Sequence, residues 1–404
     1  MQNIHTAARY SSRMAKRTIT LGDAEHMLAP VSFGTMVKPA GSACNLGCTY
    51  CYYLDKAKLY GGREPVMDDA LLEEYIRQYI EANDSAQVSF CWHGGEPLLL
   101  GVEWFRKAVA LQRRHAGGKQ IFNSLQTNGL LIDDEWCRFF AENGFLVGIS
   151  IDGPRDIQDG FRRSRAGQPT FDSVMAAIRL MQRHSVEFNT LSVVSSRSEG
   201  RGLEIYRFFR DEVGSRFMQF LPAANRQLPW AVSAEGYGQF LIDVFDEWVR
   251  HDVGESYVQI FDATLAKWCG LPPGLCSIND TCCDSLTVEH NGDVYPCDHF
   301  VGPEYLLGNI RAMTLREIYD LPRRFAFSLD KRETLPAGCR SCRYCFCCFG
   351  ECPEHRVDGK NVLCEGLKAY FEHVEPAMDI MKGLLAQQRA PAEIMTILDN
   401  RQYD

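Results

Sequence analysis

The sequence lacks a long apolar run, a secretory signal and an excess of positive charge. No stretch of its 404 residues is apolar for long enough to span a bilayer, so no membrane association is predicted. Residues 1–29 contain Arg9, Arg13, Lys16 and Arg17 but no apolar signal-peptide core, and we expect a flexible extension over residues 1–31 of a cytoplasmic protein. The formal net charge of −9 argues against nucleic acid as the main partner.

Cysteine is nearly absent from the middle of the chain. Of the 17 cysteines, only Cys91 and Cys137 lie between a loop at residues 44–51 and a second region at residues 269–364. The composition is otherwise that of an ordinary globular protein, 46% apolar and 24% charged, and the length is too great for one average domain and too small for three. In a long acidic chain without a signal peptide, two cysteine groups favour metal binding over disulfides.

The first group has three cysteines in eight positions, Cys44, Cys48 and Cys51. Thiolates are ligands for iron–sulfur clusters, zinc and copper(I). A structural zinc site uses four ligands and a redox pair uses two, whereas three would leave a [4Fe–4S] cube with one iron open to another ligand. The alternatives are a zinc knuckle and three unrelated buried cysteines.

Strands and helices alternate through the first half of the chain. The predicted strands are residues 33–38, 87–92, 121–127, 145–151, 188–194 and 217–221, and the helices between them are 68–82, 102–112, 133–142, 170–184 and 203–212. Six such units predict a parallel sheet with right-handed crossovers, curved into a partial (β/α)6 barrel. Further helices are expected at 234–250, 257–268 and 365–387, and a β-hairpin at 286–289 and 294–297.

The carboxyl ends of three predicted strands are polar on one face. Period-2 alternation groups Ser89 with Cys91 and His93, Ser124 with Gln126 and Asn128, and Gly148 with Ser150 and Asp152. A packed barrel interior is rich in branched apolar residues, so these faces predict a ligand cavity at that end. The alternative is that they point outward toward polar helix surfaces.

The second cysteine region contains eight thiols that match two clusters of four ligands: Cys276, Cys282, Cys297, Cys339, Cys342, Cys348, Cys352 and Cys364. Cys269, Cys283, Cys345 and Cys347 are additional thiols without an assigned role. Two zinc sites are the main alternative, because C-x2-C pairs also build zinc ribbons.

These motifs together resemble a known family. The loop CNLGCTYC resembles the signature of radical S-adenosylmethionine (SAM) enzymes, Gly94-Gly95-Glu96-Pro97 resembles their GGEP motif, and GDVYPCDHF with the later cysteines resembles the SPASM domain. The segments MVKPAGSACNLGCTYCYYLDK, WHGGEPLL, QTNG and GISIDGP resemble the anaerobic sulfatase-maturating enzymes. The resemblance implies a radical SAM partial barrel over residues 32–230, a helical connection over 231–275, a SPASM domain over 276–366 and a C-terminal helix and tail over 367–404.

The resemblance also implies an activity and its parts. Members of that family oxidise a cysteine or serine of a sulfatase to Cα-formylglycine, through a 5′-deoxyadenosyl radical that abstracts a Cβ hydrogen. The expected cofactors are SAM and three [4Fe–4S] clusters. The expected partners are an unfolded sulfatase segment with a Cys/Ser-x-Pro-x-Arg motif and an electron donor such as ferredoxin or flavodoxin.

Site residues follow from the resemblance position by position. Cys44, Cys48 and Cys51 would hold the cluster that binds SAM, and SAM would be contacted by Tyr50, Gly95, Ser150, Arg162 and Leu221. The first auxiliary cluster would be held by Cys276, Cys282, Cys297 and Cys352, and the second by Cys339, Cys342, Cys348 and Cys364.

Asp298 is the candidate base for the substrate proton, because it directly follows a cysteine ligand and its carboxylate would lie beside the cavity. Each of these assignments has an ordinary alternative. Arg162 would instead form a surface ion pair, Leu221 would pack in the core, and Asp298 would cap the hairpin or lie on the surface.

Two other functions are compatible with the motifs. A SPASM enzyme of this type can also modify another peptide, for example by cross-linking it. A zinc-binding interaction protein is the non-enzyme alternative, and the brown colour of iron–sulfur protein distinguishes it from colourless zinc protein.

Overall fold

The computed structural model describes residues 31–60, 66–224, 228–282 and 284–400. Of the extension predicted for residues 1–31, residues 1–30 lie outside the described ranges. Cys283 also lies outside them. Within the described ranges, no helix is both long and apolar enough to cross a membrane.

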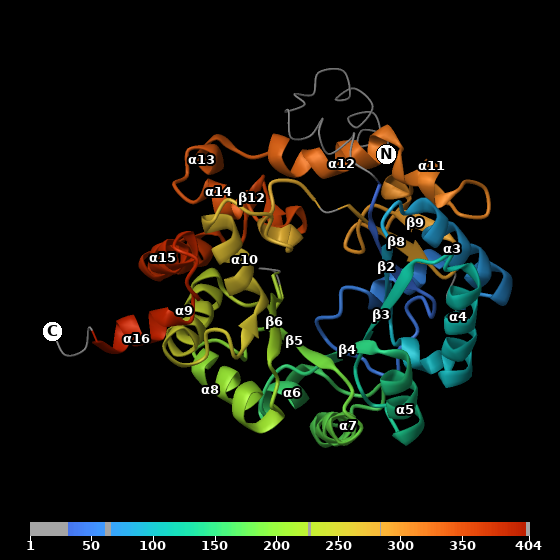
Figure 1. The fold of residues 1–404 in the computed structure, drawn as a ribbon, viewed down its shortest axis with the longest axis horizontal. Coiled ribbons are helices and arrows are strands. Elements are labelled where there is room, and N and C mark those ends of the chain that lie inside the picture. Colours follow the sequence, from blue (N-terminus) through green and yellow to red (C-terminus); the bar gives the residue numbers. More distant parts are fainter. Residues whose placement is uncertain (1–30, 61–65, 225–227, 283, 401–404) are drawn as a thin grey trace.

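Six neighbouring parallel strands form the body of a curved sheet (Figure 1). They are β1 (Gly34–Lys38), β2 (Gln87–Trp92), β3 (Gln120–Thr127), β4 (Phe145–Ser150), β5 (Phe188–Val194) and β6 (Phe217–Pro222). The connecting helices lie outside the sheet and are α3 (Asp69–Ala82), α4 (Val102–His115), α5 (Asp134–Asn143), α6 (Arg155–Phe161), α7 (Phe171–Arg183) and α8 (Gly202–Arg207). The predicted partial (β/α)6 barrel is therefore confirmed.

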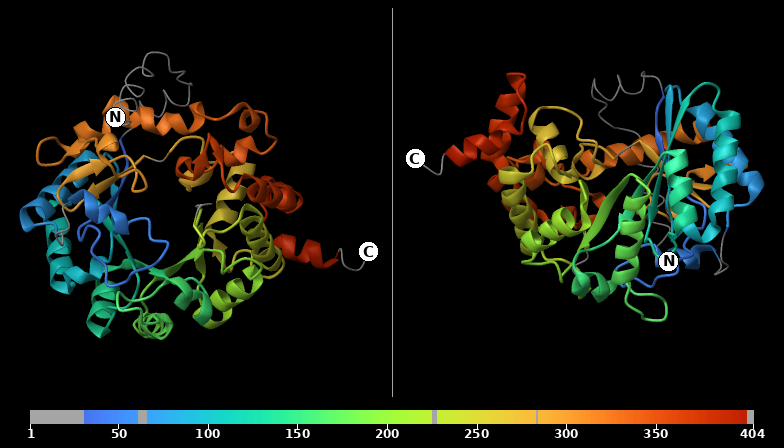
Figure 2. Two further views of the ribbon diagram at one scale, coloured as in Figure 1. Left: turned by 180° about the vertical axis from the view of Figure 1, so that it is seen from behind. Right: turned by 60° about the horizontal axis from the view of Figure 1, so that its bottom comes forward.

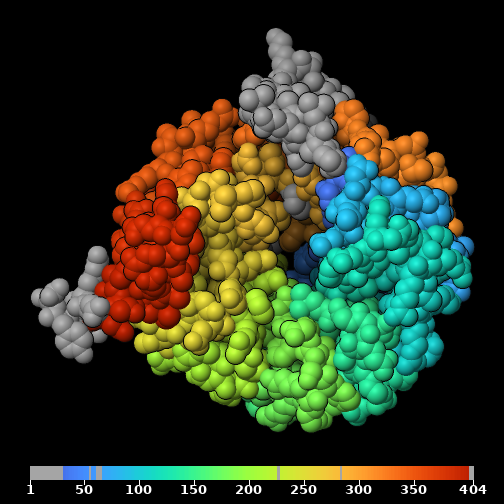
Figure 3. All heavy atoms as spheres, viewed as in Figure 1, coloured from blue at the N-terminus to red at the C-terminus, as the bar shows by residue number. Residues whose placement is uncertain are grey.

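The two faces of the strands differ as their alternation predicts. In β2 the side chains of Val88, Phe90 and Trp92 are buried at 1% exposure or less and pack against aromatic residues of α3 and α4. On the opposite face, Ser89 is exposed and Cys91 is half-buried. The inner face is thus open to a hollow, which the space-filling view shows at the centre of the ring (Figure 3).

The cysteine-rich segment continues the same sheet. Strand β8 (Ser285–Glu289) pairs in parallel with β1 along its whole length, from Gly34 opposite Ser285 to Lys38 opposite Glu289. Strands β9 (Asp293–Tyr295) and β10 (Gly308–Asn309) extend this edge antiparallel, and β7 (Tyr257–Val258) extends the other edge beside β6. The barrel and the hairpin therefore share one backbone hydrogen-bond ladder.

Helices of the C-terminal half close the ring on the side between β7 and β10 (Figures 1 and 2). They are α9 (Ala234–His251), α10 (Gln259–Trp268), α11 (Leu315–Tyr319), α12 (Pro322–Glu333), α13 (Ala337–Arg340), α14 (Cys345–Cys348), α15 (Cys364–Ala386) and α16 (Glu393–Asn400). A small two-stranded sheet, β11 (Arg356–Val357) and β12 (Lys360–Asn361), precedes α15.

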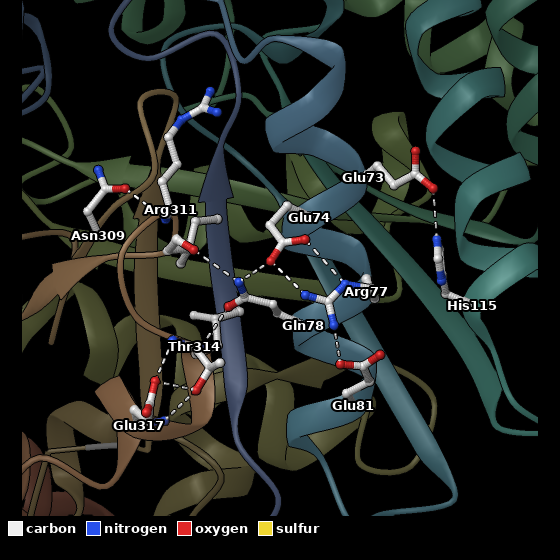
Figure 4. Close-up of polar contacts among 12 residues, drawn as sticks. Glu73, Glu74, Arg77, Gln78, Glu81, His115, Asn309, Arg311, Thr314 and Glu317 are labelled. Atoms are coloured by element: carbon white, nitrogen blue, oxygen red, sulfur yellow. Dashed lines mark hydrogen bonds and ion pairs between the residues drawn. The ribbon is translucent and has the colours of Figure 1, made fainter.

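The buried amide of Gln78 ties the barrel to the C-terminal half. Its Nε2 donates to the carbonyl of Ile310 at 3.0 Å, and its Oε1 accepts from the backbone N–H of Leu315 at 2.8 Å. Figure 4 shows Gln78 on α3 pointing toward the segment that carries Asn309 and Thr314. A side chain that satisfies two backbone groups of a distant segment fixes that segment against α3.

Helices α9 and α15 cross at two glycines. A Cβ atom at Gly366 would lie 1.7 Å from the carbonyl oxygen of Ala234, and one at Gly238 would lie 2.5 Å from the carbonyl oxygen of Gly366. Only glycine allows this approach. Because α15 begins at Cys364, the crossing also sets the position of that thiol.

Several predicted boundaries are wrong, among them the end of the helix expected over 102–112, which continues to His115, and α6 was not predicted. The strand expected at 294–297 ends at Tyr295, because Pro296 has no N–H for the ladder. The helix expected from 257 begins at Gln259, since Tyr257 pairs with Phe217 and stacks on its ring at 4.9 Å. The helix expected over 203–212 is α8 followed by a π-helical turn at Phe208–Val213.

Candidate functional site

The three cysteines of the first loop line one pocket. Cys44, Cys48 and Cys51 surround it together with Ser42, Leu46, Tyr53 and Gly95. Backbone bonds from Gly47 and Thr49 to the carbonyls of Arg163 and Phe161, at 2.9 and 3.3 Å, hold the loop against the segment after α6. The loop is thus anchored at its tip while its thiols face inward.

The thiols of this pocket fit a metal cluster better than a reactive nucleophile. Burial raises the pKa of Cys44 to about 11 and that of Cys48 to about 12, so without a cation they stay protonated and unreactive. Among the described residues, no three His, Cys, Asp or Glu side chains converge as they would around a single ion. In a [4Fe–4S] cube each thiolate binds its own iron, so such convergence is not needed.

The turn after β2 approaches this loop at backbone distance. The Gly95 N–H donates to the Gly41 carbonyl and the Glu96 N–H to the Ala43 carbonyl, both at 2.7 Å. A Cβ atom at Gly95 would lie 2.0 Å from the Ala43 oxygen, so no other residue fits there. The site therefore places the GGEP-like turn and the cysteine loop in direct contact.

The side chain of Glu96 fixes the turn through hydrogen bonds. Its fully buried carboxylate accepts from the N–H groups of Leu98 and Asn128 at 3.0 and 2.8 Å and from the Thr127 hydroxyl at 2.8 Å. Burial nevertheless raises its pKa to about 7. Glu96 thereby joins the ends of β2 and β3, and the Asn128 amide next to it lies 3.7 Å from the Cys44 sulfur.

Of the five residues predicted to contact SAM, Tyr50 and Arg162 contact the buried carboxylate of Asp152. Leu221 lies on the strand next to β5, and Gly95 lines the cysteine pocket. Asp152 is 1% exposed, accepts from the Tyr50 hydroxyl and the Val193 N–H, and pairs with Arg162 at 3.0 Å. Leu221 stands opposite Val193 in the β5–β6 ladder and is 40% exposed.

The fifth residue, Ser150, ends β4, and its hydroxyl accepts from the Gln126 amide at 2.8 Å. Within the described part of the chain, the Arg162 guanidinium has no side-chain partner other than Asp152 and the face of Tyr50, whose ring centre is 5.5 Å away. Arg162 is 8% exposed; burial lowers its pKa, but the Asp152 carboxylate outweighs burial and holds this pKa above its ordinary value. A buried cation with spare N–H donors suits a ligand carboxylate.

A second buried charge lies at the candidate base. The Lys38 ammonium, fully buried at the end of β1, is 3.4 Å from the Asp298 carboxylate and 4.1 Å from the centre of the Tyr53 ring. Asp298 also accepts from the Tyr52 hydroxyl, and Tyr52 directly follows Cys51. Burial raises the pKa of Asp298, but Lys38, His299 and the Tyr52 bond outweigh it and hold this pKa below its ordinary value.

The cysteines assigned to the first auxiliary cluster gather near Lys331. Its ammonium donates to the carbonyls of Cys276 and Ser277 at 2.5 and 2.7 Å. Burial lowers the pKa of Lys331, and the nearby Cys282, Cys276 and Cys352 oppose that shift. The fourth predicted ligand, Cys297, lies beyond β9, with its sulfur 3.7 Å from Asp298.

The cysteines assigned to the second auxiliary cluster influence one another. Burial raises the pKa of Cys364, and Cys339 and Cys342 add to that effect. Burial likewise raises the pKa of Cys348 to about 12, with Cys364 among the contributors. Cys347 is fully buried beside this group, whereas Cys345 is half-buried.

Comparison with known proteins gives consistent relatives. Residues 39–208 match the radical SAM superfamily, and residues 280–343 match the SPASM iron–sulfur cluster-binding domain. The serine-type anaerobic sulfatase-maturating enzyme of Bacteroides thetaiotaomicron is 44% identical over 90% of this chain and 94% of its own length. The cysteine-type enzyme of Clostridium perfringens strain 13 is 35% identical over 85% and 96%.

This chain belongs to the anaerobic sulfatase-maturating enzymes. The solved structure of native anSMEcpe with bound AdoMet and Cp18Cys peptide agrees, with a TM-score of 0.81 and 32% identity over 87% of this chain and 99% of that chain. Streptococcus suis SuiB, 14% identical with a TM-score of 0.58, shares the fold alone. The cofactors predicted from the sequence, SAM and three [4Fe–4S] clusters, are those of the family.

Sequence reasoning missed several residues of this maturating-enzyme site. Lys38 and Tyr52 hold Asp298, and Asp152 joins the residues predicted to bind SAM. Asp152 lies on one of the predicted polar strand faces, but the alternation alone gives it no role. Lys38 could have been found, because a lysine at the end of a strand that is predicted to be buried needs a charged partner.

Proposed function

We propose that this protein oxidises a cysteine or serine residue of a sulfatase polypeptide to Cα-formylglycine. The observation that carries the proposal is the likeness to a solved relative with bound AdoMet and peptide, over 87% of this chain. It is supported by the short distance between the three-cysteine loop and the candidate base, because Tyr52 bonds Asp298 and directly follows Cys51. Tyr53 lines the three-cysteine pocket and also contacts Lys38, the partner of Asp298.

The cluster and SAM, when bound at Cys44, Cys48 and Cys51, supply the removal of a hydrogen atom from the substrate Cβ. Gly95 and Glu96 keep the turn against the cysteine loop, and Arg162 with Ser150 binds the carboxylate of SAM. Tyr50 and Leu221 enclose the rest of that ligand. These roles follow the positions described above, where the buried Arg162 keeps donors available.

Asp298 takes the proton that the substrate must lose. Its carboxylate is kept ionised by Lys38 and is oriented by the Tyr52 hydroxyl. The substrate must also lose an electron, for which the two auxiliary cysteine groups hold the acceptors. A one-electron donor such as ferredoxin or flavodoxin would supply the electron that starts each turnover.

The deciding experiment is anaerobic incubation of the holoenzyme with SAM, reductant and a peptide containing Cys-x-Pro-x-Arg or Ser-x-Pro-x-Arg. Conversion of serine to formylglycine removes the mass of two hydrogen atoms, and conversion of cysteine replaces its sulfur and two hydrogens by an aldehyde oxygen. Mass spectrometry of the peptide reads out both changes. A holoenzyme that cleaves SAM but leaves both peptides unchanged would overturn the proposal.

Asp298→Asn tests the base. The variant keeps the size of the side chain but cannot accept the proton, so it should bind the clusters and form 5′-deoxyadenosine while formylglycine falls by a factor on the order of 10². The control is Asp293→Asn on the same hairpin, whose carboxylate instead bonds Asn291 and Asn309. Wild-type product formation by Asp298→Asn would exclude Asp298 as the base, and loss of iron would make it a support for Cys297.

A further inference from the structure

His93 lies beside the candidate base on the inner face of the barrel. It follows β2, and its N–H donates to the Val37 carbonyl at 2.8 Å, so the β1–β2 ladder continues and places His93 next to Lys38. It shares the inward face of Cys91 by strand alternation. The next two residues are Gly94 and Gly95, and Gly95 lines the cysteine pocket. His93 therefore lies on the segment after β2 that leads from the Lys38–Asp298 pair to that pocket.

The imidazole is neutral in this position. Burial and the Lys38 ammonium lower the pKa of His93 to about 3, against the opposing charge of Asp298. His93 is also among the groups that lower the pKa of Asp298. The two side chains thus share one part of the cavity, and His93 is not charged at physiological pH.

One hydrogen bond sets the tautomer of the ring. The Gly94 N–H donates to His93 Nδ1 at 2.7 Å, which occupies that lone pair. In a neutral imidazole the proton is then on Nε2, which becomes a donor. In the part of the chain that the structure describes, no group accepts from Nε2. The ring cannot act as a base through Nδ1, but its Nε2–H remains available to a ligand.

We propose that His93 is a substrate-binding residue whose Nε2–H donates a hydrogen bond to the side-chain oxygen of a serine at the position to be oxidised, and that it thereby favours serine over cysteine. The inference rests on the proposed function. A residue undergoing oxidation must meet both SAM and Asp298, and His93 lies on the segment that leads from one site to the other.

The preference follows from the acceptor chemistry. A serine hydroxyl accepts a hydrogen bond from N–H well, whereas the sulfur of cysteine is a weak acceptor. One neutral hydrogen bond changes an equilibrium about fivefold to tenfold. The other contacts of the peptide are the same for both residues, so His93 should change the ratio of the two substrates rather than the affinity for the whole peptide.

Two variants of nearly equal polarity provide the test. In His93→Gln the side-chain amide can reach the position of Nε2, while in His93→Asn it is one methylene shorter and cannot. Both should hold the same iron as the wild type. His93→Leu removes the donor altogether and serves as a third variant.

Binding is measured first, without reductant, so that no turnover occurs. SAM-loaded holoenzyme is titrated with three peptides that differ only in Ser, Cys or Ala at the target position. The wild type and His93→Gln should bind the serine peptide about fivefold to tenfold more tightly than the alanine peptide. His93→Asn and His93→Leu should bind the two peptides equally.

Turnover is measured next, as the ratio of kcat/KM for the serine and cysteine peptides. This ratio should fall about fivefold to tenfold in His93→Asn and stay near wild type in His93→Gln. Equal ratios in these two variants would overturn the role of His93 even if both peptides are oxidised. If the wild type oxidises neither peptide, the proposed function fails, while the binding comparison still decides the hydrogen bond.

Discussion

At the scale of single residues, the site depends on a few side chains that are both buried and charged. Lys38 is fully enclosed between Asp298 and the ring of Tyr53, and Arg162 between Asp152 and the ring of Tyr50. An unpaired buried charge is costly, so each cation constrains its partner carboxylate. Asp298 and Asp152 thereby stay in place when no ligand is bound. The cavity is preorganised by these pairs.

Replacing Gly95 by a larger residue should strongly disrupt the cluster site at Cys44, Cys48 and Cys51. In Gly95→Ala the new Cβ would lie 2.0 Å from the Ala43 oxygen, so the turn or the cysteine loop must move. We expect iron to fall by up to about four atoms per chain, the content of one cube, and SAM cleavage to be lost. Iron analysis and 5′-deoxyadenosine formation measure both effects.

The control for Gly95→Ala is Gly47→Ala in the cysteine loop that the turn contacts. Gly47 is exposed, and a Cβ added there meets no atom within 4 Å. This variant should keep its iron and its SAM cleavage. Normal cleavage in Gly95→Ala would mean that the contact between the turn and the loop is not needed.

Glu96 should make the folded protein less stable as the pH rises. Burial raises its pKa from 4.5 to about 7, so between these values the folded state holds a proton that the unfolded state has released. Stability therefore falls through this window, by an amount on the order of 3 kcal/mol, and levels off above it. Glu96→Gln does not titrate, so its Tm should fall less between about pH 5 and 7 than that of the wild type. Parallel Tm curves for the two proteins would contradict the raised pKa.

At the scale of elements, ligands are positioned by contacts between segments far apart in the chain. The α9–α15 crossing at Gly238 and Gly366 sets the start of α15, where Cys364 lies. The β1–β8 ladder brings the hairpin that leads to Cys297 and Asp298 beside Lys38. The buried Gln78 fixes the segment after β10 in the same way.

Gly366→Ala should therefore affect one cluster selectively. Its Cβ would lie 1.7 Å from the Ala234 oxygen, so α15 must move away from α9 and carry Cys364 with it. We expect about four of about twelve irons to be lost while SAM cleavage persists. Gly383→Ala in the same helix is the matched control, since its Cβ meets nothing within 4 Å. It should retain all iron and gain up to about 1 kcal/mol of stability. Equal iron in the two variants would contradict the role of the crossing.

At the scale of the whole molecule, one sheet supports both the three-cysteine loop and the hairpin that leads to Asp298. The strand order runs from β10 through β1 to β7 without a break, so the three-cysteine loop and the hairpin beside it do not belong to separately moving bodies. The C-terminal helices close the ring around a central hollow (Figures 1 and 3). The fold thus sets the distances between the three-cysteine loop, Asp298 and the C-terminal cysteines.

The metal content tests this arrangement as a whole. The predicted ligands form three groups of three, four and four cysteines, so anaerobically reconstituted protein should approach about twelve irons per chain. Changing Cys44, Cys48 and Cys51 together to alanine should leave about eight, because the other two groups come from different segments. Stoichiometric zinc in place of iron would contradict the assignment.

Much of this molecule could be predicted from its sequence, because the signals are local. Alternation and helical spacing follow from backbone geometry, so the six strands and five of the helices between them were found with small errors at their ends, whereas α6 was missed. The C-x3-C-x2-C loop and the Gly94-Gly95 turn are each short continuous motifs, and three thiols in one loop suit a cluster with an open iron better than a four-ligand zinc site. The family followed from these motifs.

What only the tertiary structure decided depends on contacts between residues distant in sequence. The ion pair of Lys38 with Asp298 spans 260 positions, and the bond of Tyr52 to the same carboxylate spans 246. The pairing of β8 with β1, which brings these residues together, has no local signal, because a strand does not encode its neighbour. The same holds for the ring of groups around Asp152 and for the neutral tautomer of His93. Sequence determines which groups are present, and the fold determines which of them meet.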